Sequence, residues 1–275
     1  MSDVVRRYYD RTAEIEWGRL FRDPYNMLEY IVTMHYLEKH LPLEGLILDA
    51  GGGPGRYTVE LARRGYEVVL FDLSPVSLEY AQGKIEEAGV EERIRGVVEG
   101  SITDLSEFEE RTFDAVVCLG PLSHLLERAE RETAMKELSR VAKPGAPILV
   151  SVIRLYGVFR VVLSRLSDEL LDPDHEEMFT KGIHRVDWHE ERGSGFTEAY
   201  FFHPYEVREL MEGAGIETIE MATCEGLSTG LQEATNALYE DREKWDRWIE
   251  ILLKTSNDPS ILGSSDHFLY IGRRK

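Results

Sequence analysis

Short runs of apolar residues alternate with amphipathic segments over the middle of this chain. The apolar runs predict strands, which lie at 46–50, 66–71, 94–98, 113–120 and 147–153. Between them, apolar residues at helical spacing predict helices that begin near Arg56, at Pro75 and near Glu132. Gly65 and Gly89 are suited to end the first two of these helices. Strands that alternate with helices at this pace indicate βαβ units and a parallel sheet.

The first part of the chain has a different pattern from this core, which spans 46–153. Residues 1–45 begin with aromatic side chains among charges and without a clean period. From Met27 to Leu41 apolar residues recur at helical spacing, and Pro42 closes the segment. We therefore predict an N-terminal helical arm.

The part that follows the core departs from its pattern and then returns to it. Residues 154–196 open with an apolar helix at 156–166, and we predict that they form a helical cap inserted into the domain. Residues 197–275 resume the core pattern. They predict strands at 197–202, 216–221 and 267–272, a helix from Pro204, and one long helix between 231 and 252.

Composition limits the classes of function. With 275 residues, 43% hydrophobic and 30% charged, the chain suits one large globular domain. Its formal net charge of −19 argues against nucleic acid, which is bound largely through Lys and Arg. Apolar runs fall short of the roughly 20 residues that span a bilayer. The first residues lack the apolar centre of a signal peptide, so we expect a cytoplasmic protein without a membrane partner. The oligomeric state stays open.

The most informative stretch joins the first strand to its helix and reads Asp49-Ala50-Gly51-Gly52-Gly53-Pro54-Gly55-Arg56. Each glycine costs backbone entropy on folding, so packing alone does not explain the run, and we predict that a ligand approaches the bare backbone. A glycine-rich turn without a ligand is the alternative. The dinucleotide fingerprint G-x-G-x-x-G needs a third small residue, and counted from Gly51 and Gly53 that position holds Arg56. A nicotinamide-dependent oxidoreductase is therefore disfavoured.

An acidic residue at the strand end and glycines at every second position (Asp49, Gly51, Gly53, Gly55) resemble motif I of the class I S-adenosylmethionine (SAM)-dependent methyltransferases. The resemblance extends over about residues 46–153. It implies an α/β fold with a seven-stranded, mostly parallel sheet whose last strand is antiparallel, and helices on both faces. It also implies SAM as methyl donor and S-adenosylhomocysteine as product. The turn would pass beneath the methionine part of SAM, with Asp49 helping to hold its ammonium group. The cofactor contacts expected in this stretch are Asp49, Ala50, Gly51, Gly52, Gly53 and Tyr57.

Further cofactor contacts are expected at the ends of the next strands. Asp72 ends the second strand, where Rossmann-type folds place an acid on the ribose hydroxyls, and Leu73 follows it. A carboxylate that only favours the next helix dipole is the alternative for Asp72. Ser101 stands where similar methyltransferases often carry an acid for the adenine amino group, which weakens its side-chain role. Ser101 is still an expected cofactor contact, and Ile102 could bind the adenine edge through its amide and pack on its face. The resemblance gives Leu119, at the end of the fourth strand, a carbonyl contact to the SAM ammonium.

The acceptor side of the site is expected beyond the fourth strand. His124 lies just past it and is suited to accept a proton near neutral pH, although a histidine that only packs its loop is the alternative. In similar methyltransferases such an N-terminal arm folds over the cofactor, so Tyr8, Tyr9 or Tyr25 would cover SAM; aromatic side chains that only pack on the core are the alternative. The His and acid residues at 172–177 and 182–190 lack an H-E-x-x-H pattern, and we expect no metal.

We predict methyl transfer to an oxygen, nitrogen or carbon of a small molecule; a SAM-binding sensor or scaffold without turnover is the other possibility.

Overall fold

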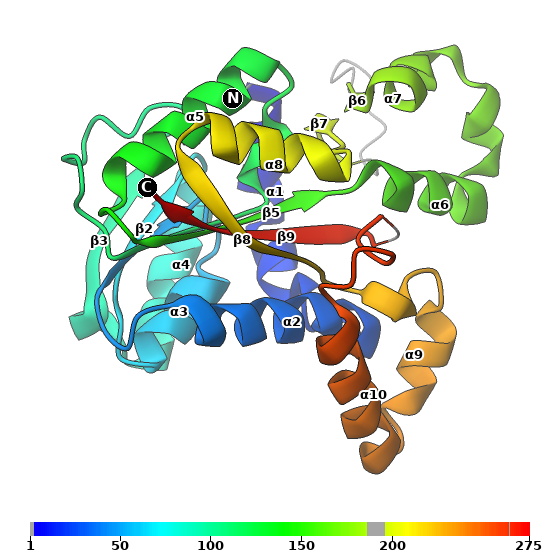
Figure 1. Ribbon diagram of the computed structural model, residues 1–275, viewed down its shortest axis with the longest axis horizontal. Coiled ribbons are helices and arrows are strands. Elements are labelled where there is room, and N and C mark those ends of the chain that lie inside the picture. Colours follow the sequence, from blue (N-terminus) through cyan, green and yellow to red (C-terminus); the bar gives the residue numbers. More distant parts are fainter. Residues whose placement is uncertain (1–2, 186–195, 264) are drawn as a thin grey trace.

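The computed structural model describes residues 3–185, 196–263 and 265–275, and its centre is a seven-stranded sheet (Figure 1). The strand order is β3-β2-β1-β4-β5-β9-β8. The strands are β1 (Leu46–Ala50), β2 (Glu67–Asp72), β3 (Ile94–Glu99), β4 (Ala115–Leu119), β5 (Pro147–Ile153), β8 (Ile216–Thr223) and β9 (His267–Arg274). β9 is antiparallel to both of its neighbours, and the pairs from β3 to β5 are parallel. The predicted α/β fold with a mostly parallel sheet is confirmed.

Two layers of helices cover the sheet, because successive strand residues point to opposite faces. On one face, Leu48 and Val116 pack in a core cluster with helices α5 (Arg128–Val141) and α8 (Pro204–Gly213). On the other face, Ile47 and Val117 pack with helices α2 (Pro24–His40), α3 (Arg56–Arg63) and α4 (Pro75–Ala88). Figure 1 shows α5 and α8 on the opposite side of the sheet from α2 and α3.

Local signals set the ends of helix α4. The hydroxyl of Ser74 accepts a hydrogen bond from the backbone N–H of Ser77 at 3.0 Å, and Pro75 is the first helical residue. Gly89 ends the helix with a φ of +65°, in the left-handed region that glycine adopts most readily. Both ends agree with the sequence prediction.

Two predicted elements in the last third of the chain were wrong. The long helix expected between 231 and 252 is two helices, α9 (Gln232–Leu238) and α10 (Arg242–Thr255). The side chain of Asp241 starts the second one by accepting from the N–H of Lys244 at 3.2 Å. The strand expected at 197–202 does not enter the main sheet. Instead, β7 (Ala199–Tyr200) pairs with β6 (Ile183–His184) in a separate two-stranded sheet.

The arm and the cap lie at the edges of this core. The arm begins with helix α1 (Asp3–Arg19), which the sequence pattern did not delimit and which packs against α4. The segment predicted as cap, residues 154–196, contains α6 (Leu155–Arg165), α7 (Glu176–Lys181) and β6, which pairs with β7 just beyond it. None of the described helices combines the length and the hydropathy that crossing a membrane requires.

Candidate active site

The strand order brings the predicted cofactor residues to one edge of the sheet. β1 lies between β2 and β4, and because these strands are parallel their carboxyl ends meet at the same edge. The order reverses at β1, and open α/β sheets bind ligands at such a switch point. Ala50, Asp72 and Leu119 end these three strands and therefore share this edge.

The glycine turn after β1 combines two different constraints. A Cβ atom on Gly51 would lie 1.9 Å from Cγ of Pro121, and one on Gly52 would lie 2.4 Å from Oδ2 of Asp49. Packing inside the protein therefore excludes side chains at these two positions, which corrects the expectation that packing does not explain them. Gly53 has a φ of +54°, and the nearest atom to a Cβ built there is Oδ2 of Asp72, at 4.0 Å. Space for a ligand is thus left beside Gly53.

The carboxylate of Asp72 is anchored by backbone amides. Its Oδ2 accepts from the N–H of Gly53 and its Oδ1 from the N–H of Ser74, both at 2.8 Å. Burial raises the pKa of Asp72 to about 6, against the lowering effect of these hydrogen bonds. The bond to Ser74 is the helix-start interaction that was the alternative for this residue. Each oxygen keeps a second lone pair, so the ribose role stays a prediction that this geometry permits.

Asp49 is enclosed more completely, with 1% of its surface exposed. Its Oδ2 accepts from the hydroxyl of Thr58 on α3 at 2.6 Å. Burial raises the pKa of Asp49 to about 6, and the carboxylate of Asp72 adds to this effect. One oxygen of Asp49 thus supports the turn and the helix after it, and its contact with the SAM ammonium stays a prediction.

The remaining predicted contacts differ in how open they are. The ring of Tyr57 is buried and stacks on Tyr30 of α2, with 5.9 Å between ring centroids. Ile102 is 2% exposed and belongs to the core on the α5 face. The hydroxyl of Ser101 lies 2.8 Å from that of Thr103. Ala50 is fully buried, whereas Leu73 and Leu119 are partly exposed at the edge. Their cofactor roles stay predictions.

His124 lies in the short helix η2 (Pro121–His124) that follows β4, and it is buried. Its Nδ1 is 2.9 Å from the carbonyl oxygen of Glu198, next to β7, and its Nε2 is 2.7 Å from the hydroxyl of Tyr9 on α1. A carbonyl only accepts, so the ring proton is on Nδ1, and Nε2 accepts from the Tyr9 O–H. Burial lowers the pKa of His124 to about 4, which keeps the ring neutral.

The three arm tyrosines proposed to cover SAM have different surroundings. Tyr9 reaches His124, and its backbone carbonyl lies 3.4 Å from the hydroxyl of Ser77 at the start of α4. Tyr8 packs edge-on against Tyr9. Tyr25 donates from its hydroxyl to Oδ2 of Asp266 at 2.6 Å. Of the three, Tyr9 is thus the one that contacts both the loop after β4 and the start of α4, the helix after β2.

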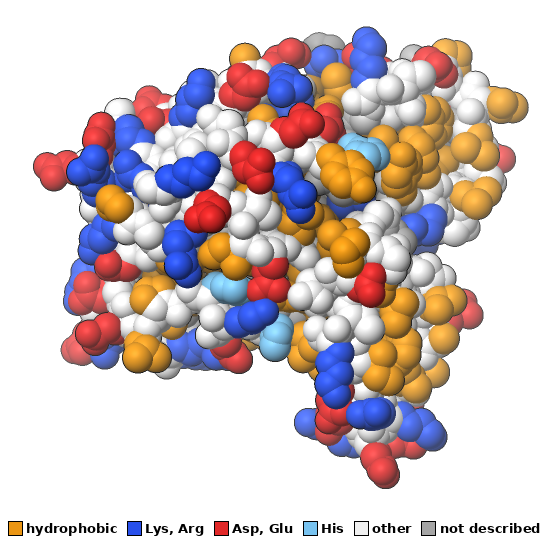
Figure 2. All heavy atoms as spheres, in the orientation of Figure 1, with side chains coloured by type: hydrophobic (Ala, Val, Ile, Leu, Met, Phe, Trp, Pro, Cys, Tyr) orange, Lys and Arg blue, Asp and Glu red, His pale blue; other side chains and the backbone are white. Residues whose placement is uncertain are grey.

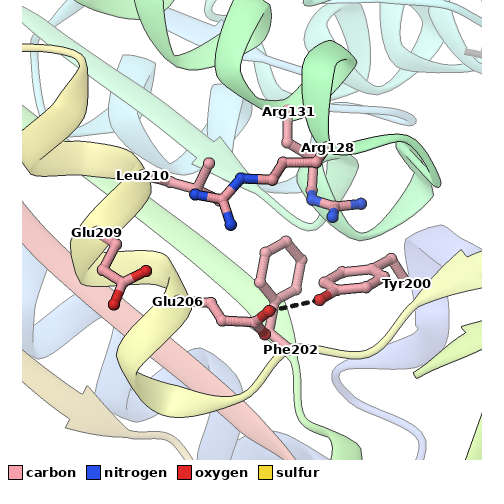
Figure 3. Close-up of a pocket in the computed structure, with 7 residues that line it drawn as sticks. All are labelled: Arg128, Arg131, Tyr200, Phe202, Glu206, Glu209 and Leu210. Atoms are coloured by element: carbon pink, nitrogen blue, oxygen red, sulfur yellow. Dashed lines mark hydrogen bonds between the residues drawn. The ribbon is translucent and has the colours of Figure 1, made fainter. Parts of the chain in front are cut away.

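The loop that carries His124 is held by Arg131, a residue that sequence reasoning missed. Its Nη1 donates to the carbonyl oxygens of Leu125 and Leu126, both at 2.7 Å. Figure 3 shows its guanidinium above the ring of Tyr200, 3.6 Å from the ring centroid, and Tyr200 donates to Glu206 at 2.6 Å. Arg131 thus joins the η2 loop to the β7 strand. An arginine within an amphipathic helix gave no signal of this role.

A second unpredicted group of charges lies where β9 begins. Nδ1 of His267 is 2.7 Å from Glu225 and 3.6 Å from Glu29, and Arg19 binds Glu29 at 2.6 Å. Burial alone would lower the pKa of His267, but the two carboxylates raise it to about 9. Nδ1 of His267 and one oxygen of each carboxylate lie within 4.8 Å of one another, which is close enough to hold a cation if the ring were deprotonated. Here His267 and Arg19 already compensate the two buried acids.

The stretches considered for a metal are only partly described. Residues 182–185 lie in the cap, where the rings of His184 and His175 stack with 6.0 Å between centroids. Residues 186–190, with Trp188 and His189, lie outside the described residues.

Comparison with known families identifies the core. The sequence profile of the methyltransferase domain family matches residues 47–145, the part that holds the glycine turn, Asp72 and Leu119. This part of the chain is a class I SAM-dependent methyltransferase domain. The methyl donor of such a domain is SAM, and its contacts with Gly53 and Asp72 stay predictions.

Individual relatives of this methyltransferase domain extend over part of the chain. A ubiquinone biosynthesis O-methyltransferase of Hahella chejuensis is 30% identical over 153 residues, 55% of this chain and 58% of that protein. A magnesium-protoporphyrin O-methyltransferase of Rhodobacter capsulatus is 33% identical over 129 residues, 43% and 55% of the two chains. The chain thus spans a little over half of these curated relatives. A solved SAM-dependent methyltransferase of Methanosarcina mazei shares the fold, with a TM-score of 0.61 at 21% identity over 87% of this chain and 96% of that one.

Proposed function

We propose that this protein transfers the methyl group of SAM to an oxygen, nitrogen or carbon atom of a small molecule in the cytoplasm. One observation carries the proposal. The N–H of Gly53 donates to the carboxylate of Asp72, and the space beside Gly53 is open to a ligand. Both residues lie within the residues that match the methyltransferase domain family. Bound SAM would supply an activated methyl group on its sulfonium. The turn, Asp49 and Asp72 would hold it.

The predicted acceptor side is enclosed by the N-terminal arm and the cap, and this favours a small acceptor. The ring of His124 is bonded to Tyr9 of helix α1 and lies 5.7 Å, between ring centroids, from Phe196 at the end of the cap, so arm and cap both reach the acceptor side. A long polyanion would need a gathered basic surface. On the face in Figure 2, Lys and Arg side chains are interspersed with Asp and Glu, and the net charge is −19. The two curated relatives above carry O-methyltransferase names, which favours an oxygen acceptor.

His124 is the residue that we propose as general base. Its Nε2 is a hydrogen-bond acceptor aimed at the Tyr9 hydroxyl, and an acceptor O–H in place of that hydroxyl would meet the same lone pair. The burial that lowers the pKa of His124 makes it a weak base in the closed form. Alignment of donor and acceptor in a dry site would therefore contribute more than proton transfer.

The cap is the part that we propose to select the acceptor. Tyr156 and Phe159 of α6 pack on each other with 6.0 Å between ring centroids, and Phe159 packs on Phe179 of α7 at 5.6 Å. Apolar walls with a few polar groups are typical of pockets for small organic molecules. Figure 2 shows hydrophobic side chains gathered over the cap, which includes the exposed Leu163 and Leu171.

Two measurements test the proposal. Calorimetry with SAM, S-adenosylhomocysteine and NAD should show binding of the first two only. Mass spectrometry of a metabolite extract incubated with protein and methyl-labelled SAM should then reveal a labelled small molecule, and the Asp72→Ala variant should form much less of it. Binding of SAM without any labelled product would instead support the sensor or scaffold alternative, and preferential binding of NAD would contradict the proposal.

A further inference from the structure

Arg154 is a fully buried arginine whose guanidinium has no hydrogen-bond partner among the described residues. It is the first residue after β5, its side chain has 0% exposure, and Nε, Nη1 and Nη2 all lack a partner there. The guanidinium lies against the ring of Phe268, whose centroid is 5.1 Å from the guanidinium carbon. A cation–π contact compensates only part of the cost of burying this charge.

Two other arginines, the buried Arg131 and the partly exposed Arg19, show that this is unusual for the molecule. Arg131 donates to two backbone carbonyls, and Arg19 forms a bidentate pair with Glu29. The backbone carbonyl of Asp266 accepts from the N–H of Arg154 at 2.9 Å, but the side chain of Asp266 is engaged by Tyr25 and Arg160. Burial lowers the pKa of Arg154 to about 10, which still leaves the group charged at neutral pH. The guanidinium of Arg154 thus carries five N–H donors that have no acceptor among the described residues.

The backbone of Arg154 lies on the acceptor side of the predicted site. The N–H of Ile153, the preceding residue, donates to the hydroxyl of Ser123 at 3.0 Å, and Ser123 is the neighbour of His124. The N–H of Leu155, the following residue, donates to the carbonyl of Phe202 at 3.2 Å, just beyond β7. Arg154 therefore stands where the η2 loop, the cap and the carboxyl edge of β5 meet.

We propose that Arg154 binds a carboxylate group of the methyl acceptor. The inference rests on the proposed function, and it narrows the acceptor to an anionic small molecule. A planar guanidinium matches a carboxylate with two parallel hydrogen bonds. A single group with charge −1 fits better than a polyphosphate, because Arg160, the neighbouring cation, is already paired with Asp266 and the chain is strongly acidic.

The first test uses the free protein, so that it does not depend on methyl transfer. Thermal unfolding is followed with acetate, acetamide or inorganic phosphate at constant ionic strength, for wild type, Arg154→Met and the control Arg165→Gln, an exposed arginine of α6. Acetate should raise the unfolding midpoint of wild type and the control, and acetamide should not. Arg154→Met should lose the acetate effect and unfold at or above the wild-type temperature, since an unpaired buried charge is removed.

Equal acetate shifts in wild type and Arg154→Met, or a midpoint several degrees lower in Arg154→Met, would overturn the proposal. If phosphate alone raised the unfolding midpoint, the proposal that Arg154 binds a carboxylate would be wrong, and the acceptor would instead carry a phosphate ester.

The second test uses the extract assay after the metabolites have been split on an anion-exchange resin. The methylated acceptor should come from the retained, anionic fraction. Arg154→Met should methylate it on the order of 100-fold more slowly than wild type while it binds SAM with unchanged affinity. Methylation of an acceptor from the unretained fraction would contradict the role of Arg154 but leave the methyltransferase proposal intact. Absence of SAM binding in wild type would instead contradict the proposed function, and the acetate test would still decide on Arg154.

Discussion

The hydroxyl of Tyr9 lies 2.7 Å from Nε2 of His124, a residue 115 positions further along the chain. The other nitrogen of the same ring is bound by the carbonyl of Glu198 at 2.9 Å. One imidazole thus connects the N-terminal arm, the loop after β4 and the segment that leads from the cap into β7. A substitution of either Tyr9 or His124 should therefore change both the free energy of unfolding and the activity at the predicted site.

Replacing Tyr9 by Phe removes the donor to a buried nitrogen. Because Nε2 of His124 would be left without a partner, the free energy of unfolding should fall by about 1–2 kcal/mol. Urea unfolding measures this, and Tyr8→Phe on the same helix is the matched control, with an expected change within about 0.5 kcal/mol. An equal decrease in the free energy of unfolding in both variants would show that the Tyr9–His124 hydrogen bond does not stabilise the fold.

Replacing His124 by Gln tests both its charge state and its chemistry. The pKa of His124 is lowered to about 4 from 6.5, so between these values the unfolded chain binds more protons than the native one. Wild-type stability should therefore gain up to about 3 kcal/mol from this residue as the pH rises from 4 to 6.5. Asp49 and Asp72 oppose this trend, so the difference between wild type and His124→Gln over pH 4–7.5 is the quantity to measure. Near-normal turnover with an unaltered pH–rate profile in the variant would exclude the base role.

The glycine turn allows a comparison of two neighbouring positions. In Gly51→Ala the new Cβ would overlap Pro121, and the protein should lose several kcal/mol of stability or fail to fold. In Gly53→Ala the φ of +54° costs roughly 1–2 kcal/mol, but the space is open, so the fold should persist. The methyl group would then occupy ligand space, and calorimetry should show at least tenfold weaker SAM binding. A folded Gly53→Ala variant with wild-type SAM affinity would exclude the turn as the cofactor seat.

The sequence alone predicted the parts of this molecule that depend on near neighbours. Apolar runs and glycine ends gave the parallel sheet, and the Ser74-Pro75 pair gave the start of α4, because each signal acts within one or two turns of chain. The cofactor edge followed from strand order, since residues that end parallel strands share an edge.

Contacts between distant segments could not be predicted in this way. Arg154 looked like the first residue of the cap, and only the structure shows that its surroundings provide no partner among the described residues. Asp241 was a polar residue within an apolar stripe, and its capping bond splits the expected long helix. The contact between Tyr9 and His124 joins segments that no local pattern relates, although both residues had been singled out for other reasons.

Asp72 should bind SAM through its ionised carboxylate. Asp72→Ala removes the acceptors for the ribose hydroxyls, and SAM affinity should fall by about 1–3 kcal/mol, or roughly 5- to 150-fold. Because the pKa of Asp72 is raised to about 6, wild-type affinity should also weaken as the pH is lowered through 6. Calorimetry at pH 5, 6 and 7.5 measures both effects, with Asp104→Ala, an exposed acid beyond β3, as control. Unchanged SAM affinity in a folded Asp72→Ala variant would refute the ribose assignment.

His267 should make the protein less stable in alkaline solution. Its pKa is raised to about 9 from 6.5 by Glu29 and Glu225, so the native state binds more protons than the unfolded chain between these values. The stability that this ion pair contributes is complete below pH 6.5 and is lost as the pH rises to 9, up to about 3 kcal/mol. Urea unfolding at pH 6.5, 7.5 and 9 should show this decline in wild type. His267→Gln should be less stable at pH 6.5 and nearly independent of pH over the same range, and a parallel decline in both proteins would assign the alkaline loss to other groups.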